Sequence, residues 1–195
     1  LPYEHDSEAP STVVLSSTEP ASPSNNASPM LKGTAEPGAN ITIFQESGCT
    51  GSAVASGVAD DTGAFEILTP VGLNQVTLLT AHATDEAGNI SDCSQALAYE
   101  HDDTPPEAPE LDYTTPESPG TSLQPVVHGA AEPSAVVRLY YDAACTQSAA
   151  EAVTAGVNDG VFTFALSGFV QANSTTNFYA NATDASDNTS SCSAA

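Results

Sequence analysis

An internal repeat constrains the fold of this 195-residue chain more than any other feature of its sequence. Tyr3-Glu4-His5-Asp6 recurs as Tyr99-Glu100-His101-Asp102, an offset of 96 residues, and Cys49-Thr50 recurs as Cys145-Thr146 at the same offset. Cys93-Ser94 recurs as Cys192-Ser193 at an offset of 99. The chain therefore holds two copies of one unit, and the second copy carries three extra residues after its first cysteine.

The repeat also closes on itself. Joining the C-terminal Cys192-Ser193-Ala194-Ala195 to the N-terminal Leu1-Pro2-Tyr3-Glu4 reproduces the internal junction between Cys93 and Glu100. Two arrangements account for one closed period. We expect this sequence to be one part of a longer covalent array of repeats. The alternative is a set of separate subunits that meet head to tail, where the start of one chain completes the last strand of another, as in β-strand addition.

Short alternating segments predict the fold class. Ile41 and Ile43 alternate with Thr42, and Phe162 and Phe164 alternate with Thr163, which is typical of a sheet with one buried face. Each copy has about 100 residues and about seven such segments, as in an immunoglobulin-like domain. In the first copy we expect strands near 11–16, 29–35, 39–46, 52–59, 63–68, 75–84 and 92–100.

We therefore predict an all-β fold of two tandem immunoglobulin-like β-sandwich domains in a rod-like array. Residues 1–6 are expected to end a preceding linker or last strand. The first repeat is expected to span residues 7–102, and the second to span residues 103–195.

Charge excludes several classes of function. The chain has 25 acidic residues and two basic ones, for a formal net charge of −23. Such a surface repels nucleic acids and anionic lipids, which are bound through Lys and Arg. No apolar stretch approaches the roughly 20 residues that cross a bilayer. Because 40% of the residues are hydrophobic, the chain can build a core and is not disordered.

Several motifs resemble a known family. Gly33-Thr34-Ala35-Glu36-Pro37-Gly38, Asp61-Thr62-Gly63-Ala64-Phe65 and Ala83-Thr84-Asp85-Glu86-Ala87-Gly88-Asn89 follow one another in the order seen in bacterial Ig-like repeats of large surface proteins and adhesins. The second copy departs from the last motif with Ala185-Ser186-Asp187-Asn188, which has no glycine. The resemblance implies an extracellular stalk or an adhesive role, often stabilised by calcium.

The cysteines occur as one pair per copy at repeated positions, which predicts the disulfides Cys49–Cys93 and Cys145–Cys192. Four cysteines allow three pairings, and the sequence does not exclude the other two. Disulfides indicate an oxidising location outside the cytoplasm, so we expect the chain at the cell surface or in the extracellular space.

Acidic residues gather in two kinds of segment that calcium could use, since it prefers six to eight hard oxygen ligands. One is the linker before each repeat, and the other is the turn between the last two strands. Solvated turn carboxylates are the equally weighted alternative. The candidate calcium ligands are Asp102, Asp103, Glu132, Asp184 and Asp187, with Asp6, Glu36 and Asp85 as the corresponding residues of the first repeat.

No sequence motif indicates catalysis: we find no nucleophile elbow, phosphate loop or helical metal-binding motif. We predict a spacer or fibre segment whose partners are neighbouring identical repeats or subunits. The alternative is a module that binds a glycan or a protein, with Tyr140 and Tyr141 as candidate contact residues. His5 and His101, in the repeated Glu-His-Asp, are expected to pack or to face water; the alternative is that they bind a transition metal with the flanking acids.

Overall fold

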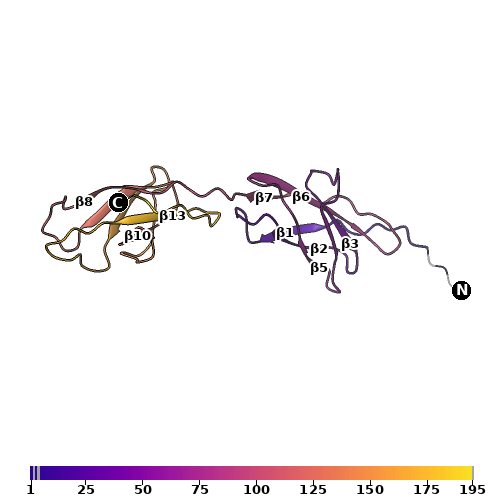
Figure 1. The fold of residues 1–195 in the computed structure, drawn as a ribbon. Coiled ribbons are helices and arrows are strands. Elements are labelled where there is room, and N and C mark those ends of the chain that lie inside the picture. The colour runs from indigo at the N-terminus through magenta and orange to yellow at the C-terminus, as the bar shows by residue number, and fades with distance from the viewer. Residues whose placement is uncertain (2, 4, 195) are drawn as a thin grey trace. The chain divides into compact units, whose positions relative to one another are not determined.

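The computed structural model describes residues 1, 3 and 5–194 of the chain (Figure 1). Pro2 and Glu4, which belong to the predicted segment 1–6, lie outside the described residues. By its internal contacts the chain divides into two compact units, Leu1–Asp103 and Thr104–Ala195. Within the described residues, the sheets of both units are built from antiparallel strand pairs and no helix occurs, so the predicted all-β fold is confirmed.

The first unit packs two sheets against one core, with strand orders β1-β2-β5 and β4-β3-β6-β7. The strands are β1 (Val14–Glu19), β2 (Met30–Thr34), β3 (Asn40–Phe44), β4 (Ala55–Val58), β5 (Ala64–Leu68), β6 (Gln75–Thr84) and β7 (Leu97–His101).

The second unit repeats this plan with two sheets of three strands, in the orders β12-β9-β8 and β11-β10-β13. The strands are β8 (Glu110–Thr115), β9 (Val126–Ala130), β10 (Val136–Tyr140), β11 (Val153–Thr154), β12 (Val161–Ala165) and β13 (Tyr179–Thr183). The 10-residue strand β6 corresponds to the five-residue strand β13. Among the described residues, no strand of the second unit corresponds to β7.

The cores form as the alternation predicts. Ile41 and Ile43 on β3 are fully buried, as is Phe164 on β12, while their polar neighbours Thr42 and Thr163 are not. Burying one such side chain contributes about 1.5–3 kcal/mol relative to leaving it exposed, so the two-residue period orients each sheet.

A repeated glycine lets the outer strand approach the core. A Cβ at Gly33 would lie 2.5 Å from the Phe65 ring and 2.5 Å from the Val14 carbonyl oxygen. At the equivalent Gly129, a Cβ would lie 2.7 Å from the Phe162 ring. Any larger residue on the central strand β2 would collide with the aromatic ring and with the backbone of the neighbouring strand β1. This explains why the position is glycine in both copies.

The last strand of the first unit starts later than the sequence predicts. We expected strand structure from residue 92, whereas β7 begins at Leu97. Residues 91–94 still run beside β6, but serine side chains replace part of their backbone ladder. This arrangement belongs to the disulfide site described next.

Candidate functional site

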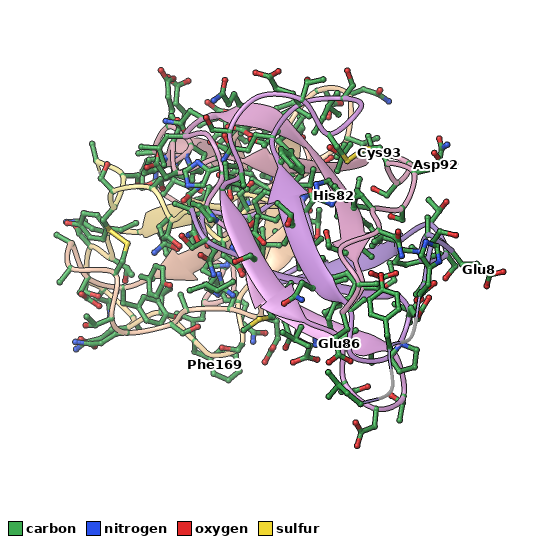
Figure 2. All side chains as sticks on the ribbon, turned by 90° about the vertical axis from the view of Figure 1, so that its right-hand side faces the viewer. Glu8, His82, Glu86, Asp92, Cys93 and Phe169 are labelled. Atoms are coloured by element: carbon green, nitrogen blue, oxygen red, sulfur yellow. A yellow bond between two sulfur atoms is a disulfide. The ribbon has the colours of Figure 1, made fainter. Side chains whose placement is uncertain are left out.

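Both predicted disulfides are present. Cys49 bonds to Cys93 and Cys145 bonds to Cys192, with Cα–Cα distances of 5.7 and 5.9 Å. Each bridge joins the loop after the third strand of its unit to the segment that precedes the last strand position. In the first unit the loop that follows β3 lies against β6, where the Thr80 hydroxyl donates to the Glu46 carbonyl oxygen at 2.6 Å. This contact brings the loop close to the segment that holds Cys93. Figure 2 labels Cys93 and its exposed neighbour Asp92.

Two serines flank Cys93 and hold its segment against β6. The Ser91 N–H donates to the Ala83 carbonyl, and the Ser91 hydroxyl accepts from the Ala83 N–H at 2.9 Å. Ser94 makes the same pair of bonds with Ala81. Each hydroxyl thus takes the place of a backbone carbonyl, so buried N–H groups of β6 stay satisfied where the ladder is irregular.

The second unit repeats this arrangement around Cys192. Ser190 bonds Ala182 and Ser193 bonds Ala180 through the same two groups, with N–H to hydroxyl distances of 3.0 Å. The prediction from sequence gave these serines no role. Their signal was the Ser-x-Cys-Ser pattern, which occurs once in each copy.

The acidic turn before this segment is closed by its own side chains. In the first unit the Asp85 carboxylate accepts from the Asn89 backbone N–H at 2.8 Å and from the Asn89 side chain at 2.9 Å. The Asn89 side chain and the nearby backbone N–H groups lower the pKa of Asp85 below its ordinary value. Asp184 and Asn188 make the same contacts at 2.9 and 3.0 Å.

The second copy builds this turn without glycine. Gly88 has a φ of 93°, and the equivalent Asp187 has a φ of 64°. Aspartate is one of the few non-glycine residues that enter the left-handed region readily. The turn therefore survives the sequence difference.

A further turn depends on Asp60, which directly precedes the family motif that begins at Asp61. Its carboxylate oxygen accepts from the Thr62 hydroxyl at 2.7 Å, the Thr62 N–H at 2.8 Å and the Ala64 N–H at 2.9 Å. These bonds, the Thr62 hydroxyl foremost, lower the pKa of Asp60. The carboxylate acts here as a turn cap.

The candidate calcium ligands lie in both units. Asp6, Glu36, Asp85, Asp102 and Asp103 belong to the first unit, and Glu132, Asp184 and Asp187 belong to the second. Among the described residues, no group of three or more His, Cys, Asp or Glu side chains is placed to hold a metal ion. The oxygens of Asp85 and Asp184 already accept hydrogen bonds within their own turns. Calcium binding stays a prediction.

The two candidate binding tyrosines are half-buried. The Tyr140 hydroxyl bonds the Asn181 side-chain oxygen at 3.3 Å, and the Tyr141 ring lies 5.9 Å from the Phe178 ring. Phe169 is the most exposed aromatic residue of this unit, at 72% (Figure 2). A binding role for Tyr140 and Tyr141 also stays a prediction.

The repeated histidines have different surroundings. His101 is 2% exposed, and its Nδ1 accepts from the Asn74 N–H at 2.9 Å. His5 is exposed. Packing in one copy and exposure to water in the other are the two outcomes that the sequence predicts.

An open groove runs along β8 in the second unit. Its largest cavity, about 430 Å³, lies between β8 and residues 176–178. A cavity of about 390 Å³ shares Leu111 and Asp112 with it, and a cavity of about 280 Å³ shares Thr114 and Phe178. The three cavities thus share lining residues along β8. Sequence reasoning did not locate this groove.

Among the described residues, the model contains no helix that is long and apolar enough to span a membrane.

Comparisons with known proteins agree with this architecture. Residues 19–100 match the family model described as a bacterial Ig domain. A solved structure titled "Biofilm associated protein - BSP domain" is 13% identical with a TM-score of 0.34, a likeness too low to support an argument. That alignment covers 96% of this chain and 28% of the other, so this chain spans under a third of its length. No match was found among curated proteins. The predicted resemblance to bacterial Ig-like repeats is thus confirmed for residues 19–100, which are similar to this family.

Proposed function

We propose that this chain is a structural segment of an extracellular bacterial protein, in which Ig-like repeats build a stalk, an adhesin spacer or a surface fibre. In this role the chain performs no catalysis, and its partners are neighbouring identical repeats or subunits. The Ig-like fold, the sequence repeat and the disulfide in each unit support the proposal.

One observation carries the proposal: the residues that the two copies share serve the fold of each unit. Cys49 and Cys145 form equivalent disulfides, Ser94 and Ser193 make equivalent strand contacts, and Asp85 and Asp184 close equivalent turns. An active site is normally unique within a chain, whereas residues that maintain a repeat unit recur with it.

The disulfides and the net charge support the proposed location outside the cell. Two disulfides in so short a chain persist in an oxidising environment. The net charge of −23 keeps the chain soluble and repels other anionic surfaces. Both properties suit a segment that extends from a cell.

Surface labelling tests the proposal directly. Antibodies raised against the folded chain are applied to cells of the native source before and after permeabilisation. We expect the same labelling in both samples, and loss of labelling when intact cells are treated with protease. Labelling only after permeabilisation would contradict the extracellular role.

Calcium stabilisation is a further part of this proposal, supported by the acidic linkers and turns of the sequence. The stated alternative role, recognition of a glycan or protein through Tyr140 and Tyr141, is tested with a glycan array. Reproducible binding that is lost in Tyr140→Ala or Tyr141→Ala would replace the pure spacer role.

A further inference from the structure

We propose that the outer face of strands β10 and β13 in the second unit binds an acidic sugar, that is, a sugar ring that carries one carboxylate. The Arg138 guanidinium holds this carboxylate. The inference goes beyond the structural role, and it rests in part on the alternative role of glycan recognition through Tyr140. For that role it names the class of ligand and the residue that anchors it.

Arg138 is a cation that the fold leaves unpaired. The chain has only two lysine and arginine residues against 25 acidic ones. Lys32 is paired with Glu19 and Glu66 on the first unit. Arg138 is exposed on β10 and, among the described residues, makes no ion pair. Its guanidinium is therefore open to a carboxylate from outside the chain.

The sandwich does not require arginine at this position. The corresponding residue of the first unit is Thr42, which pairs with His82 as Arg138 pairs with Asn181. Both units form the same sandwich with these different pairs. Residues that maintain a repeat unit recur with it, so a pair found in only one copy can serve a ligand.

The register of β10 and β13, which lie side by side, places the polar groups of the site on one face (Figure 1). Arg138 lies opposite Asn181, and Tyr140 lies opposite Tyr179. Thr183 shares this face, because alternate residues of a strand point the same way. The residues between them are buried, so the face points away from the core. From Thr183 to Tyr179 the face extends about 13 Å, enough for two linked sugar rings.

Hydrogen bonds within this face hold the side chains in place. The Arg138 Nη1 donates to the Thr183 hydroxyl at 3.2 Å, and the Thr183 and Thr189 hydroxyls bond each other at 3.0 Å. The Tyr140 hydroxyl donates to the Asn181 side-chain oxygen at 3.3 Å. Within the described part of the chain, the other Arg138 N–H groups and the Asn181 side-chain N–H groups make no further hydrogen bond. A site held in this way loses little conformational entropy on binding.

These groups match the chemistry of an acidic sugar. A planar guanidinium binds a carboxylate through two parallel hydrogen bonds. The Asn181 amide N–H groups and the threonine hydroxyls can bond the hydroxyls of a sugar ring. The Tyr140 ring offers an apolar surface with a polar end beside them.

The overall charge and the strand pairing disfavour other ligands. A net charge of −23 repels polyanions, so a single carboxylate on an otherwise neutral ligand is the better match. A peptide that adds to a sheet needs an open edge, whereas β10 is already paired with β11 and β13 on its two sides. Recognition must therefore use the side chains of the face.

A glycan array with matched oligosaccharides that end either in glucuronic acid or in glucose tests the proposal. We expect the 195-residue chain to bind only the members that end in glucuronic acid. In an NMR titration with methyl glucuronide, Arg138→Thr should weaken binding at least about tenfold, as for a lost hydrogen bond to a charged group. Arg138→Lys should weaken it less, because lysine keeps the charge but not the two parallel bonds.

The first unit supplies the control for folding. Arg138→Thr introduces the residue that the first unit has at this position, so the melting temperature should stay unchanged. Gln124→Glu is the matched control for charge, because it lowers the net charge by the same one unit at an exposed position before β9. This variant should bind methyl glucuronide as the unsubstituted chain does.

Three results would overturn the inference: equal binding of glucuronic acid and glucose, binding of neither, or binding that Arg138→Thr leaves unchanged. Binding of peptides rich in Asp and Glu with no glycan bound would also overturn it, and would assign Arg138 to a protein partner. None of these results affects surface labelling, which tests the structural role. Binding of neutral glycans that is lost in Tyr140→Ala and kept in Arg138→Thr would remove the acidic-sugar site and keep the alternative glycan role.

Discussion

The Ser94 hydroxyl stands in for a backbone carbonyl opposite Ala81, whose buried N–H donates to it at 3.0 Å. Ser94→Ala removes the acceptor and leaves this N–H unsatisfied. We expect a loss of about 1–3 kcal/mol in the free energy of unfolding of the first unit, measured by urea denaturation.

The control for this substitution is Ser47→Ala, at an exposed loop position, which should change the free energy by less than about 0.5 kcal/mol. Equal effects of the two substitutions would show that the Ser94 contact does not stabilise the unit. Ser193→Ala should act in the same way on the second unit, because its hydroxyl accepts from the Ala180 N–H.

Removing one disulfide should weaken only the unit that contains it. The Cys49–Cys93 bond spans 44 residues, and the chain-entropy model gives such a loop about 3–4 kcal/mol. Cys49→Ser combined with Cys93→Ser should therefore lower the melting temperature of the first unit, as seen by calorimetry. The double variant of Cys145 and Cys192 is the matched control, and a loss of the same transition in both variants would contradict the assignment of one bond to each unit.

Glycine at position 88 should matter for its backbone conformation alone. Gly88 has a φ of 93°, and a Cβ there would meet no atom within 4 Å. We expect Gly88→Ala to cost about 1–2 kcal/mol, the cost of the left-handed region for an ordinary residue. Gly168→Ala is the control, since a Cβ there also meets nothing and its φ is not positive. A neutral Gly88→Ala would contradict the assigned turn geometry.

Acid should weaken the turn that Asp60 closes. Its pKa is lowered in the folded chain by the Thr62 hydroxyl and by backbone N–H groups. A lowered folded-state pKa contributes stability above the unfolded-state pKa, and this stability is lost as the pH falls through the folded value. Carbon NMR titration should give a midpoint for Asp60 below the ordinary range of aspartate. Asp60→Asn should make the first unit less sensitive to acid, with the exposed Asp61→Asn as the control for charge.

Calcium binding is tested by thermal unfolding in EDTA and in millimolar calcium. A bound ion raises the melting temperature because it binds only the folded state. Magnesium at the same concentration is the control for screening of the net charge of −23. An unchanged melting temperature across EDTA and calcium would contradict the prediction.

Sequence and structure agree where one physical rule decides the outcome. The two-residue period around Ile41 and Phe164 sets which face is buried. One cysteine pair at repeated positions in each copy predicts the pairing that the structure has, although four cysteines allow three. The Ser-x-Cys-Ser contacts were missed because a serine hydroxyl in a strand follows no hydrophobic period. The groove beside β8 was missed because it depends on how neighbouring segments pack against that strand. The alternation of residues along one segment carries no information about its neighbours.

The position of the disulfide also sets how far a unit can lengthen under tension. In a fibre, pulling force enters each unit through its ends and reaches Cys49 and Cys93 before the residues between them. The bond shields this segment, whose ends are separated by 44 residues in sequence, from the load. Its contour length, about 150 Å at the reach of an extended chain, stays unavailable while the bond is intact. When the first unit unfolds under force with the bond intact, only β1, β2, β3 and β7 can extend. When the bond is reduced, the segment between the cysteines can extend as well.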